Sequence, residues 1–163
     1  LMAPVPTAAT VEYHAKIVRE KAVLRRLIEV STGIVTEAFD SWASGGQTFF
    51  TDVLSPDVNW TIEGSGPSTG LFQGRDQFLQ RAVRPFALRM SKPVRPVSRQ
   101  IWAEGDHVVI NWEGVGIAGD GRPYENSYAW IFRMQNGKAV EVTAFLDLTP
   151  YDDVLRRVPL PSE

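Results

Sequence analysis

The second half of the chain holds strand-like runs of apolar, β-branched and aromatic residues that are separated by very short polar turns. The runs are residues 97–104, 107–117, 124–134 and 138–147, and the turns are Gly105-Asp106, Gly119-Asp120-Gly121 and Asn136-Gly137. Turns this short join neighbouring antiparallel strands, because a parallel connection needs a crossover of a dozen or more residues. The pattern therefore predicts an antiparallel meander.

Helical periodicity dominates the beginning of the chain. Apolar residues return at helical spacing over residues 11–32 and again over residues 34–42, and Gly33 lies between the two stretches. Glycine costs about 1 kcal/mol inside a helix. We therefore expect Thr10 to cap a first helix and Gly33 to separate it from a second one.

The middle of the chain alternates between helical and strand patterns. Residues 49–54 predict a short helix, and Val58, Trp60 and Ile62 alternate with polar residues as in a half-buried strand. Residues 75–89 predict a helix that Pro85 kinks or ends, and Thr149 and Pro150 begin a last helix. Helices come first and one sheet follows, which is the order of an α+β domain.

Composition narrows the functional classes. The 163 residues contain no cysteine and two histidines, so we expect neither a metal nor another cofactor. Residues 1–33 carry five basic and three acidic side chains, a charge of +2, which leaves −4 for the rest of a chain with net charge −2. This balance predicts no nucleic-acid partner. The absence of a long apolar run and of a leader pattern predicts a cytoplasmic protein without a membrane segment.

The segments FDSWASGG, DVNWTIEG, GLFQG, RDQFL, YENSYAWIFRMQNGKAVEV and AFLDLTPYDDVL occur in this order within residues 34–158. Together they resemble the SnoaL-like group of the ketosteroid-isomerase-like (nuclear transport factor 2-like) superfamily. The resemblance implies a cone-shaped α+β domain, in which a curved antiparallel sheet is wrapped by N-terminal helices around an apolar pocket. We therefore expect a SnoaL-like domain at residues 34–163, preceded by a helical extension at residues 1–33. The resemblance does not define a reaction, because proteins with this fold catalyse many different reactions or none.

Residues 4–35 carry a second resemblance, through VPTAATVEYHAKIVREKAVLRRLIEVSTGIV. This segment is similar to the linker-helix region of DnaB-type replicative helicases. A helicase motor needs a GxxxxGK[ST] loop for nucleoside triphosphate, and the chain has none. Helicase activity is therefore excluded. A natural fusion, an engineered or reconstructed chimera and a chance amphipathic helix remain open.

Alternation along each strand predicts which residues contact the pocket. Aligning the turn at Gly121 with related epoxide hydrolases implies that Asn111 and Glu113 point inward. The other predicted binding residues are Trp60, Ile62, Phe78, Phe86, Asn126, Tyr128, Trp130 and Phe132. The same alignment turns an apolar set outward, through which we expect two copies to dimerise: Val108, Ile110, Trp112, Ile131 and Phe145.

Glu113, Asp147 and Tyr128 are the candidates for catalysis, and the binding residue Asn111 would assist them. Glu113, buried in an apolar pocket, would have a raised pKa suited to a general acid or base, and Tyr128 and Asn111 would donate hydrogen bonds to an oxyanion. Glu113 is alternatively tied to a structural partner. Asp147 is the rival acid, because the family's last strand carries an acid there, and it alternatively caps the last helix.

The sequence leaves three functions open. The first is a cofactor-free isomerase, cyclase or hydrolase that uses acid-base chemistry on a small apolar carbonyl compound. The second is a ligand-binding or structural domain, favoured if Glu113 is paired and no other acid reaches the pocket. The third is an interaction module, in which residues 11–32 dock on a partner helix or a replication protein.

Overall fold

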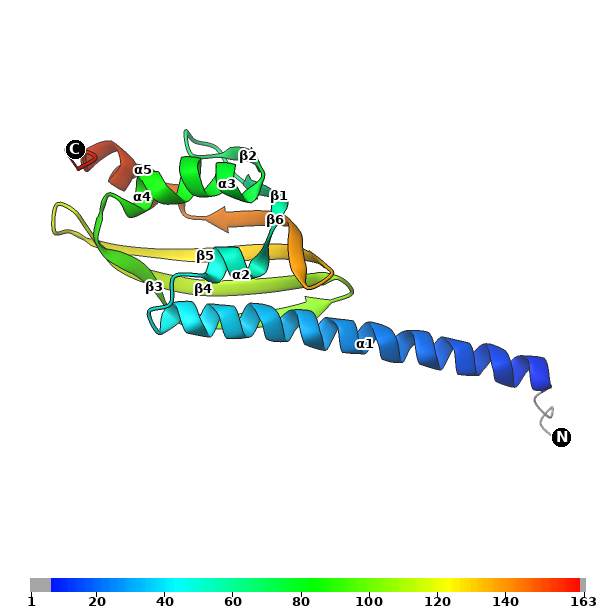
Figure 1. Cartoon of the computed structure of the whole chain (residues 1–163). Coiled ribbons are helices and arrows are strands. Elements are labelled where there is room, and N and C mark those ends of the chain that lie inside the picture. The colour runs from blue at the N-terminus through cyan, green and yellow to red at the C-terminus, as the bar shows by residue number, and fades with distance from the viewer. Residues whose placement is uncertain (1–6, 162–163) are drawn as a thin grey trace.

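A curved six-stranded sheet, with helices packed against one of its faces, forms the body of the protein (Figure 1). The structure is a computed structural model that describes residues 7–161. The strand order is β2-β1-β6-β5-β4-β3, and all neighbours are antiparallel except β1 and β6, which are parallel. The strands are β1 Leu54–Ile62, β2 Gly70–Gln73, β3 Met90–Glu104, β4 His107–Ala118, β5 Pro123–Gln135 and β6 Lys138–Leu146. The α+β prediction is confirmed.

The predicted meander corresponds to β3, β4, β5 and β6. Strand β3 starts at Met90 rather than at residue 97, and its register against β4 shifts repeatedly between Met90 and Ser98. Prolines at positions 93 and 96 contribute to this irregularity, because proline has no backbone N–H to donate to a neighbouring strand. The short strand β2 lies where the sequence indicated only a loop.

The first helix, α1, runs without a break from Ala8 to Ala43, so the predicted break at Gly33 is wrong. Its N-cap is Thr7 rather than Thr10, and the Thr7 hydroxyl accepts a hydrogen bond from the Thr10 backbone N–H at 3.3 Å. Gly33 is tolerated because the following turns bury Val35 and Phe39 completely, which outweighs the small cost of one glycine.

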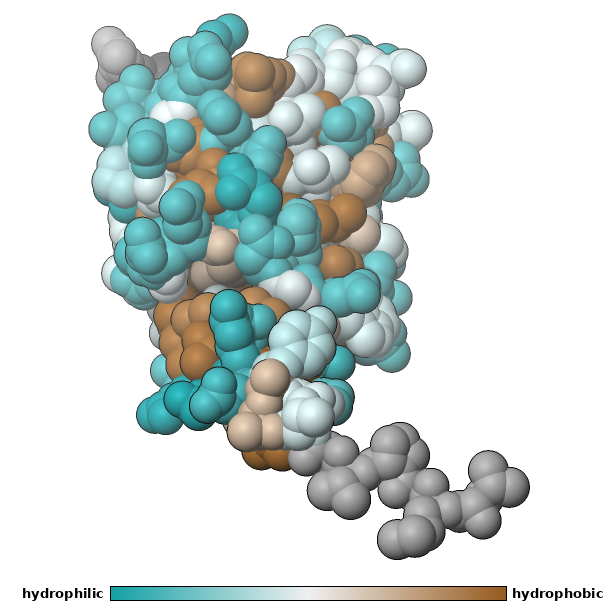
Figure 2. Space-filling view, turned by 90° about the vertical axis from the view of Figure 1, so that its right-hand side faces the viewer, coloured by the Kyte–Doolittle hydropathy of each residue, from teal (hydrophilic) through white to brown (hydrophobic). Residues whose placement is uncertain are grey.

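The beginning of α1 projects away from the sheet (Figure 1). Nearly every residue from 7 to 30 is exposed, and Figure 2 shows brown, apolar side chains beside teal, polar ones along this end of the helix. The first buried side chain is that of Val35. The boundary between an extension at residues 1–33 and a domain at residues 34–163 stays a prediction, and residues 1–6 lie outside the described residues.

The shorter helices cover the same face of the sheet as the end of α1. They are α2 Phe49–Val53, α3 Arg75–Phe78, the π-helical segment η1 Leu79–Val83, α4 Arg84–Ala87 and α5 Leu148–Arg157. Pro85 cannot donate a hydrogen bond to the preceding turn and its ring crowds the carbonyl there, which accounts for the wider π turn just before it. The predicted kink at Pro85 thus takes the form of a π segment within one continuous helical stretch.

The core contradicts the predicted facing of β4. Val108, Ile110 and Trp112 are at most 2% exposed and point toward the helices, whereas Asn111 and Glu113 are exposed on the outer face. A slip of one residue exchanges the two faces of a strand, so the alignment on Gly121 placed every side chain of β4 on the wrong side. The residues of β1 and β5 that were predicted to point inward are buried.

Gly114 explains how β4 accommodates a buried indole. A Cβ atom at this position would lie 2.6 Å from the Trp112 ring and 2.8 Å from the Val94 side chain. Both distances are shorter than real Cβ contacts, so only glycine leaves room for the indole to lie across the strand.

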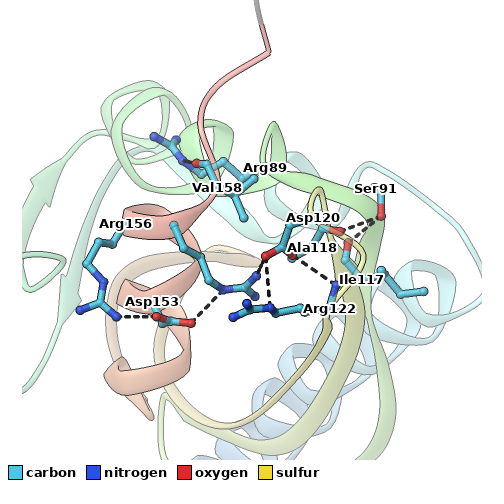
Figure 3. A network of polar contacts seen from close by, with 10 residues as sticks. Arg89, Ser91, Ile117, Ala118, Asp120, Arg122, Asp153, Arg156 and Val158 are labelled. Atoms are coloured by element: carbon cyan, nitrogen blue, oxygen red, sulfur yellow. Dashed lines mark hydrogen bonds and ion pairs between the residues drawn. The ribbon is translucent and has the colours of Figure 1, made fainter.

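An ion-pair network fixes α5 to the turn between β4 and β5 (Figure 3). The Arg157 guanidinium donates to the carboxylates of Asp120 and Asp153, and its hydrogen bond holds the pKa of Asp120 below the usual range. Nearby, Arg89 Nε donates to the backbone oxygen of Val158 at 2.8 Å. Helix α5 is therefore held at two points, by the turn between β4 and β5 and by Arg89.

Candidate functional site

A cavity of about 440 Å³ lies between the inner face of the sheet and the helices. Its volume is in the range of small-molecule sites. The residues that line it come from every layer of the domain: Trp42, Gly46, Gln47, Phe49, Phe50, Trp60, Ile62, Phe78, Ala82, Val83, Phe86, Ala87, Met90, Pro93, Val94, Arg95, Trp112, Tyr128, Trp130, Ala144, Leu146 and Tyr151. No aspartate, glutamate or histidine is among these described lining residues.

Stacked and edge-on aromatic rings form the walls. Trp60 stacks on Phe78 with 4.0 Å between the ring centroids, and Trp112 stacks on Tyr128 at 3.9 Å. Trp130 meets Trp60 edge to face at 5.3 Å. Each ring is held by its neighbours, so the walls are formed before any ligand enters.

A chain of hydrogen bonds runs from the backbone of Asp147, just after β6, to the cavity through three side chains of β5. Asn126 Oδ1 accepts from the backbone N–H groups of Asp147 (3.1 Å) and Ser127 (2.8 Å), which identifies Nδ2 as the donor end of the amide. Asn126 Nδ2 donates to Tyr124 Oη at 2.8 Å, and the Tyr124 and Tyr128 hydroxyl oxygens are 2.8 Å apart.

Either hydroxyl can donate in the hydrogen bond between Tyr124 and Tyr128. Tyr124 is 2% exposed and is not part of the lining, whereas Tyr128 lines the cavity. When Tyr124 donates to Tyr128, the Tyr128 proton is available to a ligand at the cavity wall. Burial raises the pKa of Tyr128 and of Tyr124, so both hydroxyls stay protonated at neutral pH.

Two further donors in the wall have no partner. The indole Nε1–H groups of Trp60 and Trp112 are buried and make no hydrogen bond within the described part of the chain. A buried unsatisfied donor costs about 1–3 kcal/mol. Tyr151 is satisfied, because its hydroxyl donates to the Ala82 carbonyl in the π segment at 3.2 Å, and burial raises the pKa of Tyr151.

Arg95 brings a positive charge to the edge of the cavity. Its Nη1 donates to the backbone oxygens of Trp42 (2.9 Å) and Gly46 (2.8 Å), and its Nη2 donates to that of Gly45 (3.3 Å). These carbonyls lie at and just beyond the end of α1, where the helix leaves its last carbonyl groups unpaired. Arg95 therefore caps the helix and lines the cavity at the same time.

The predicted site residues separate into three groups. The cavity is lined by Trp60, Ile62, Phe78, Phe86, Tyr128 and Trp130. Phe132 and Asn126 are buried on the same side of the sheet but are not part of the lining. Asn111, Glu113 and Asp147 are exposed and do not contact the cavity.

The inward positions predicted for Asn111 and Glu113 are wrong, because β4 presents its other face to the helices. Glu113 accepts a hydrogen bond from Ser98 Oγ at 3.0 Å on the outer face. Asp147 is the N-cap of α5, and its carboxylate accepts from the Thr149 backbone N–H at 2.9 Å. The structural alternative that the sequence left open for Asp147 is the one that its hydrogen bond supports.

Sequence reasoning missed several residues of the cavity wall: Trp42, Phe50, Arg95, Trp112 and Tyr151. Trp42 and Phe50 lie on helix faces whose apolar spacing was visible in the sequence. Trp112 was assigned to the wrong face. Arg95 carried no sequence signal, because a charged residue in a strand is ordinarily taken to face solvent.

No group of three or more His, Asp or Glu side chains suited to a metal ion occurs among residues 7–161. Within the same residues, no helix combines the length and apolar character that crossing a membrane requires.

The fold and the aromatic cavity define a pocket-forming α+β domain of the nuclear transport factor 2-like kind. Residues 35–142 match the SnoaL-like domain, and the chain belongs to this family. The fold is shared with an NTF2-like protein from Burkholderia pseudomallei (TM-score 0.64, 19% identity, 77% of this chain and 97% of that chain). It is also shared with TerC co-crystallised with polyporic acid (TM-score 0.62, 16% identity, 78% of this chain and 98% of that chain).

A different similarity covers a short stretch. Thirty-five residues, 22% of this chain, are 60% identical to the replicative DNA helicase DnaB of Geobacillus stearothermophilus. The chain spans 8% of the length of that curated relative. The predicted resemblance of residues 4–35 to these helicases is thereby confirmed, and it covers only a short part of the chain. None of residues 7–35 lines the cavity.

Proposed function

We propose that this protein binds a small aromatic compound in the cavity and orients it through a hydrogen bond from Tyr128. The observation that carries the proposal is a preformed cavity of about 440 Å³ with aromatic walls and the Tyr128 hydroxyl group in its lining. Apolar walls of this kind take up a ligand through burial of its surface, and a few polar groups set its orientation. The polyporic acid complex of TerC, which shares the fold, supports a cyclic organic ligand.

The cavity supports ligand binding rather than acid-base catalysis by a carboxylate. A general acid or base must come within hydrogen-bond reach of the proton that it transfers. Glu113 and Asp147 are the two predicted acids, and both lie outside the lining. The alternative of a ligand-binding domain therefore comes before that of an acid-base enzyme.

A second candidate is catalysis by Tyr128 alone, favoured by the position of this residue in the cavity wall. A hydroxyl that donates to a carbonyl oxygen stabilises the negative charge that develops there during ring closure or isomerisation. When Tyr124 donates to Tyr128, the hydrogen bond that Asn126 donates to Tyr124 strengthens Tyr128 as a donor. This candidate needs no acid within the cavity and is an isomerase or cyclase activity.

The binding proposal is tested with 2-acetylnaphthalene, an apolar aromatic ketone, and with naphthalene, which lacks the acceptor. At a ketone concentration of 100 times the Kd, we expect about 2.7 kcal/mol of stabilisation. For a chain of this length, that raises Tm by roughly 5–10 °C in calorimetry. Tyr128→Phe should lower ketone affinity about three- to tenfold and leave naphthalene binding unchanged, because one hydrogen bond is lost.

Glu113→Gln is the matched control, since it alters an exposed side chain on the outer face of the sheet. We expect it to change neither affinity. If Glu113→Gln weakens ketone binding and Tyr128→Phe does not, the orientation assigned to the ligand is wrong. If neither probe raises Tm, the binding proposal itself is wrong.

We also propose that two copies associate through the outer face of the sheet, by a set of residues that keeps Ile131 and Phe145 from the predicted one and replaces the residues of β4. Trp102, Val109 and Ile131 form one row across β3, β4 and β5 on that face. Phe145 lies in the next row, and Trp102 and Phe145 are 53% and 46% exposed. A twofold axis would let this patch bury itself against its own copy.

Trp102→Glu should convert the dimer into a monomer, because it introduces a charge into the apolar row. Light scattering at micromolar concentration should give twice the 18.2 kDa of the chain for the native protein and 18.2 kDa for the variant. Leu71→Glu is the control, since Leu71 is equally exposed (54%) on β2, at the opposite edge of the sheet from β3. A native protein that is monomeric would contradict the proposal.

The remaining predictions concern α1 and cellular location. The exposed apolar side chains of α1, among them Leu24 and Leu27, support a role for residues 11–32 in contacting a partner helix. That role and the cytoplasmic location stay predictions.

A further inference from the structure

We propose that the cavity selects aromatic ligands that carry an anionic group, and that Arg95 binds this group. The anion would be a carboxylate or an acidic enol or phenol oxygen. The inference rests on the proposed binding function and adds to it the charge of the ligand. It begins with the way in which β3 directs a guanidinium toward an apolar cavity.

The irregular start of β3 turns Arg95 inward. Pro93, Val94 and Arg95 are consecutive, yet all of them line the cavity. In a regular strand successive side chains point to opposite faces, so three in a row cannot do this. The register of β3 shifts on both sides of this stretch, between Lys92 and Arg95 and between Pro96 and Ser98. The local break in pairing is what places a charged side chain beside the aromatic walls.

The Arg95 guanidinium is held firmly and still has donors to spare. A guanidinium has five N–H groups. Three of them donate to the backbone oxygens of Trp42, Gly46 and Gly45, which anchors the side chain to the end of α1. Among the described residues, Nε–H and one Nη2–H have no acceptor. A carboxylate or a pair of acidic oxygens suits two such neighbouring donors.

The charge of Arg95 is only partly compensated. It takes part in none of the ion pairs found in residues 7–161, and the lining contributes no aspartate or glutamate. The carbonyl end of a helix offsets about half of an elementary charge. The remainder lies beside an apolar cavity, where charges interact more strongly than in water. An anionic ligand would complete the neutralisation.

The uncharged polar groups of the lining favour the same class of ligand. Among the described residues, the indole N–H groups of Trp60 and Trp112 have no partner, and the Tyr128 hydroxyl can donate to a ligand when Tyr124 donates to it. Gln47 holds the one side-chain amide oxygen of the lining. The cavity therefore offers several donors and few acceptors. A ligand rich in acceptor oxygens satisfies them, whereas a ligand that donates leaves them unpaired.

The test compares 2-naphthoate with 2-naphthamide, which have nearly the same shape and differ in charge. Isothermal titration calorimetry at pH 7 should give at least tenfold tighter binding of the acid to the native protein. Raising the salt concentration should weaken acid binding and leave amide binding unchanged. A guanidinium that only caps α1 predicts equal affinities for the two probes.

Variants then assign the preference to Arg95. Arg95→Gln should reduce the ratio of the two affinities to about one, and Arg95→Lys should keep part of it. Because the ratio is taken within each variant, a general loss of stability does not alter it. Arg133→Gln is the control, since Arg133 pairs with Glu141 away from the lining, and it should keep the full preference.

Each result has a distinct meaning. Equal binding of acid and amide by the native protein overturns the anion preference and leaves the binding function standing. A preference that persists in Arg95→Gln overturns the role of Arg95. Failure of 2-naphthoate, 2-naphthamide and 2-acetylnaphthalene to bind overturns the binding function together with this inference. If Arg95→Gln does not fold, the native affinity ratio and Arg95→Lys still decide the matter.

Discussion

Replacing Trp112 with alanine should lower the free energy of unfolding by about 3–5 kcal/mol, the loss typical of a large aromatic side chain removed from a core. The indole is 2% exposed and stacks on Tyr128. It also meets the rings of Phe39, Trp42 and Trp130 edge to face. Urea unfolding followed by far-ultraviolet circular dichroism measures the change.

Trp102→Ala is the matched control, because Trp102 lies on the outer face and is 53% exposed. Measured at a concentration low enough for the protein to be monomeric, this variant should lose less than about 1 kcal/mol. Equal losses of unfolding free energy in the two variants would contradict the orientation of β4. A larger loss in Trp102→Ala would mean that the inner and outer faces of the sheet are exchanged.

Replacing Asn126 with leucine, which has a similar size, should lower the free energy of unfolding by about 3 kcal/mol or more. The amide of Asn126 makes four hydrogen bonds, two of them with the backbone N–H and C=O of Asp147 and one each with Ser127 and Tyr124. Leucine would leave several partly buried groups without partners, each at a cost of about 1–3 kcal/mol. Chemical denaturation measures this change in the free energy of unfolding.

Asn111→Leu is the control for this substitution, since Asn111 is exposed on the outer face of β4. We expect it to change the free energy of unfolding by no more than about 0.5 kcal/mol. The two asparagines were both predicted to face the pocket, and this pair of variants separates them. If Asn126→Leu is as stable as the native protein, the hydrogen-bond chain to Tyr128 does not hold the end of β6.

Local chemistry accounts for the parts of the fold that the sequence predicted well. Asn136 and Gly137 form the last turn of the meander with φ angles of 51° and 75°, a conformation that asparagine and glycine tolerate. Trp60 and Ile62 were assigned to the inner face by simple alternation, and both line the cavity. Short-range rules were sufficient here because turn conformation and strand alternation depend on residues that are neighbours in the sequence.

The orientation of β4 was predicted less well by alignment with a related family than by the hydrophobic alternation of its own residues. Val108, Ile110 and Trp112 alternate with Asn111 and Glu113, so hydrophobic alternation alone favours the observed face. Aligning a turn with distant relatives overrode this signal. The pairing of β4 with β5 contradicts the predicted orientation as well. Trp112 lies opposite Tyr128, and cross-strand partners share a face, so the two cannot point to opposite sides.

The sequence by itself determined the α+β class, the meander, part of the apolar set of the cavity walls and the family. Tertiary structure decided the continuity of α1 through Gly33, because burial of Val35 and Phe39 outweighs the cost of a single glycine. It also decided the position of Arg95. Pro93 and Pro96 indicate an irregular strand but not which side chain turns inward, because that depends on contacts with β4 and the end of α1, which are far away in the sequence.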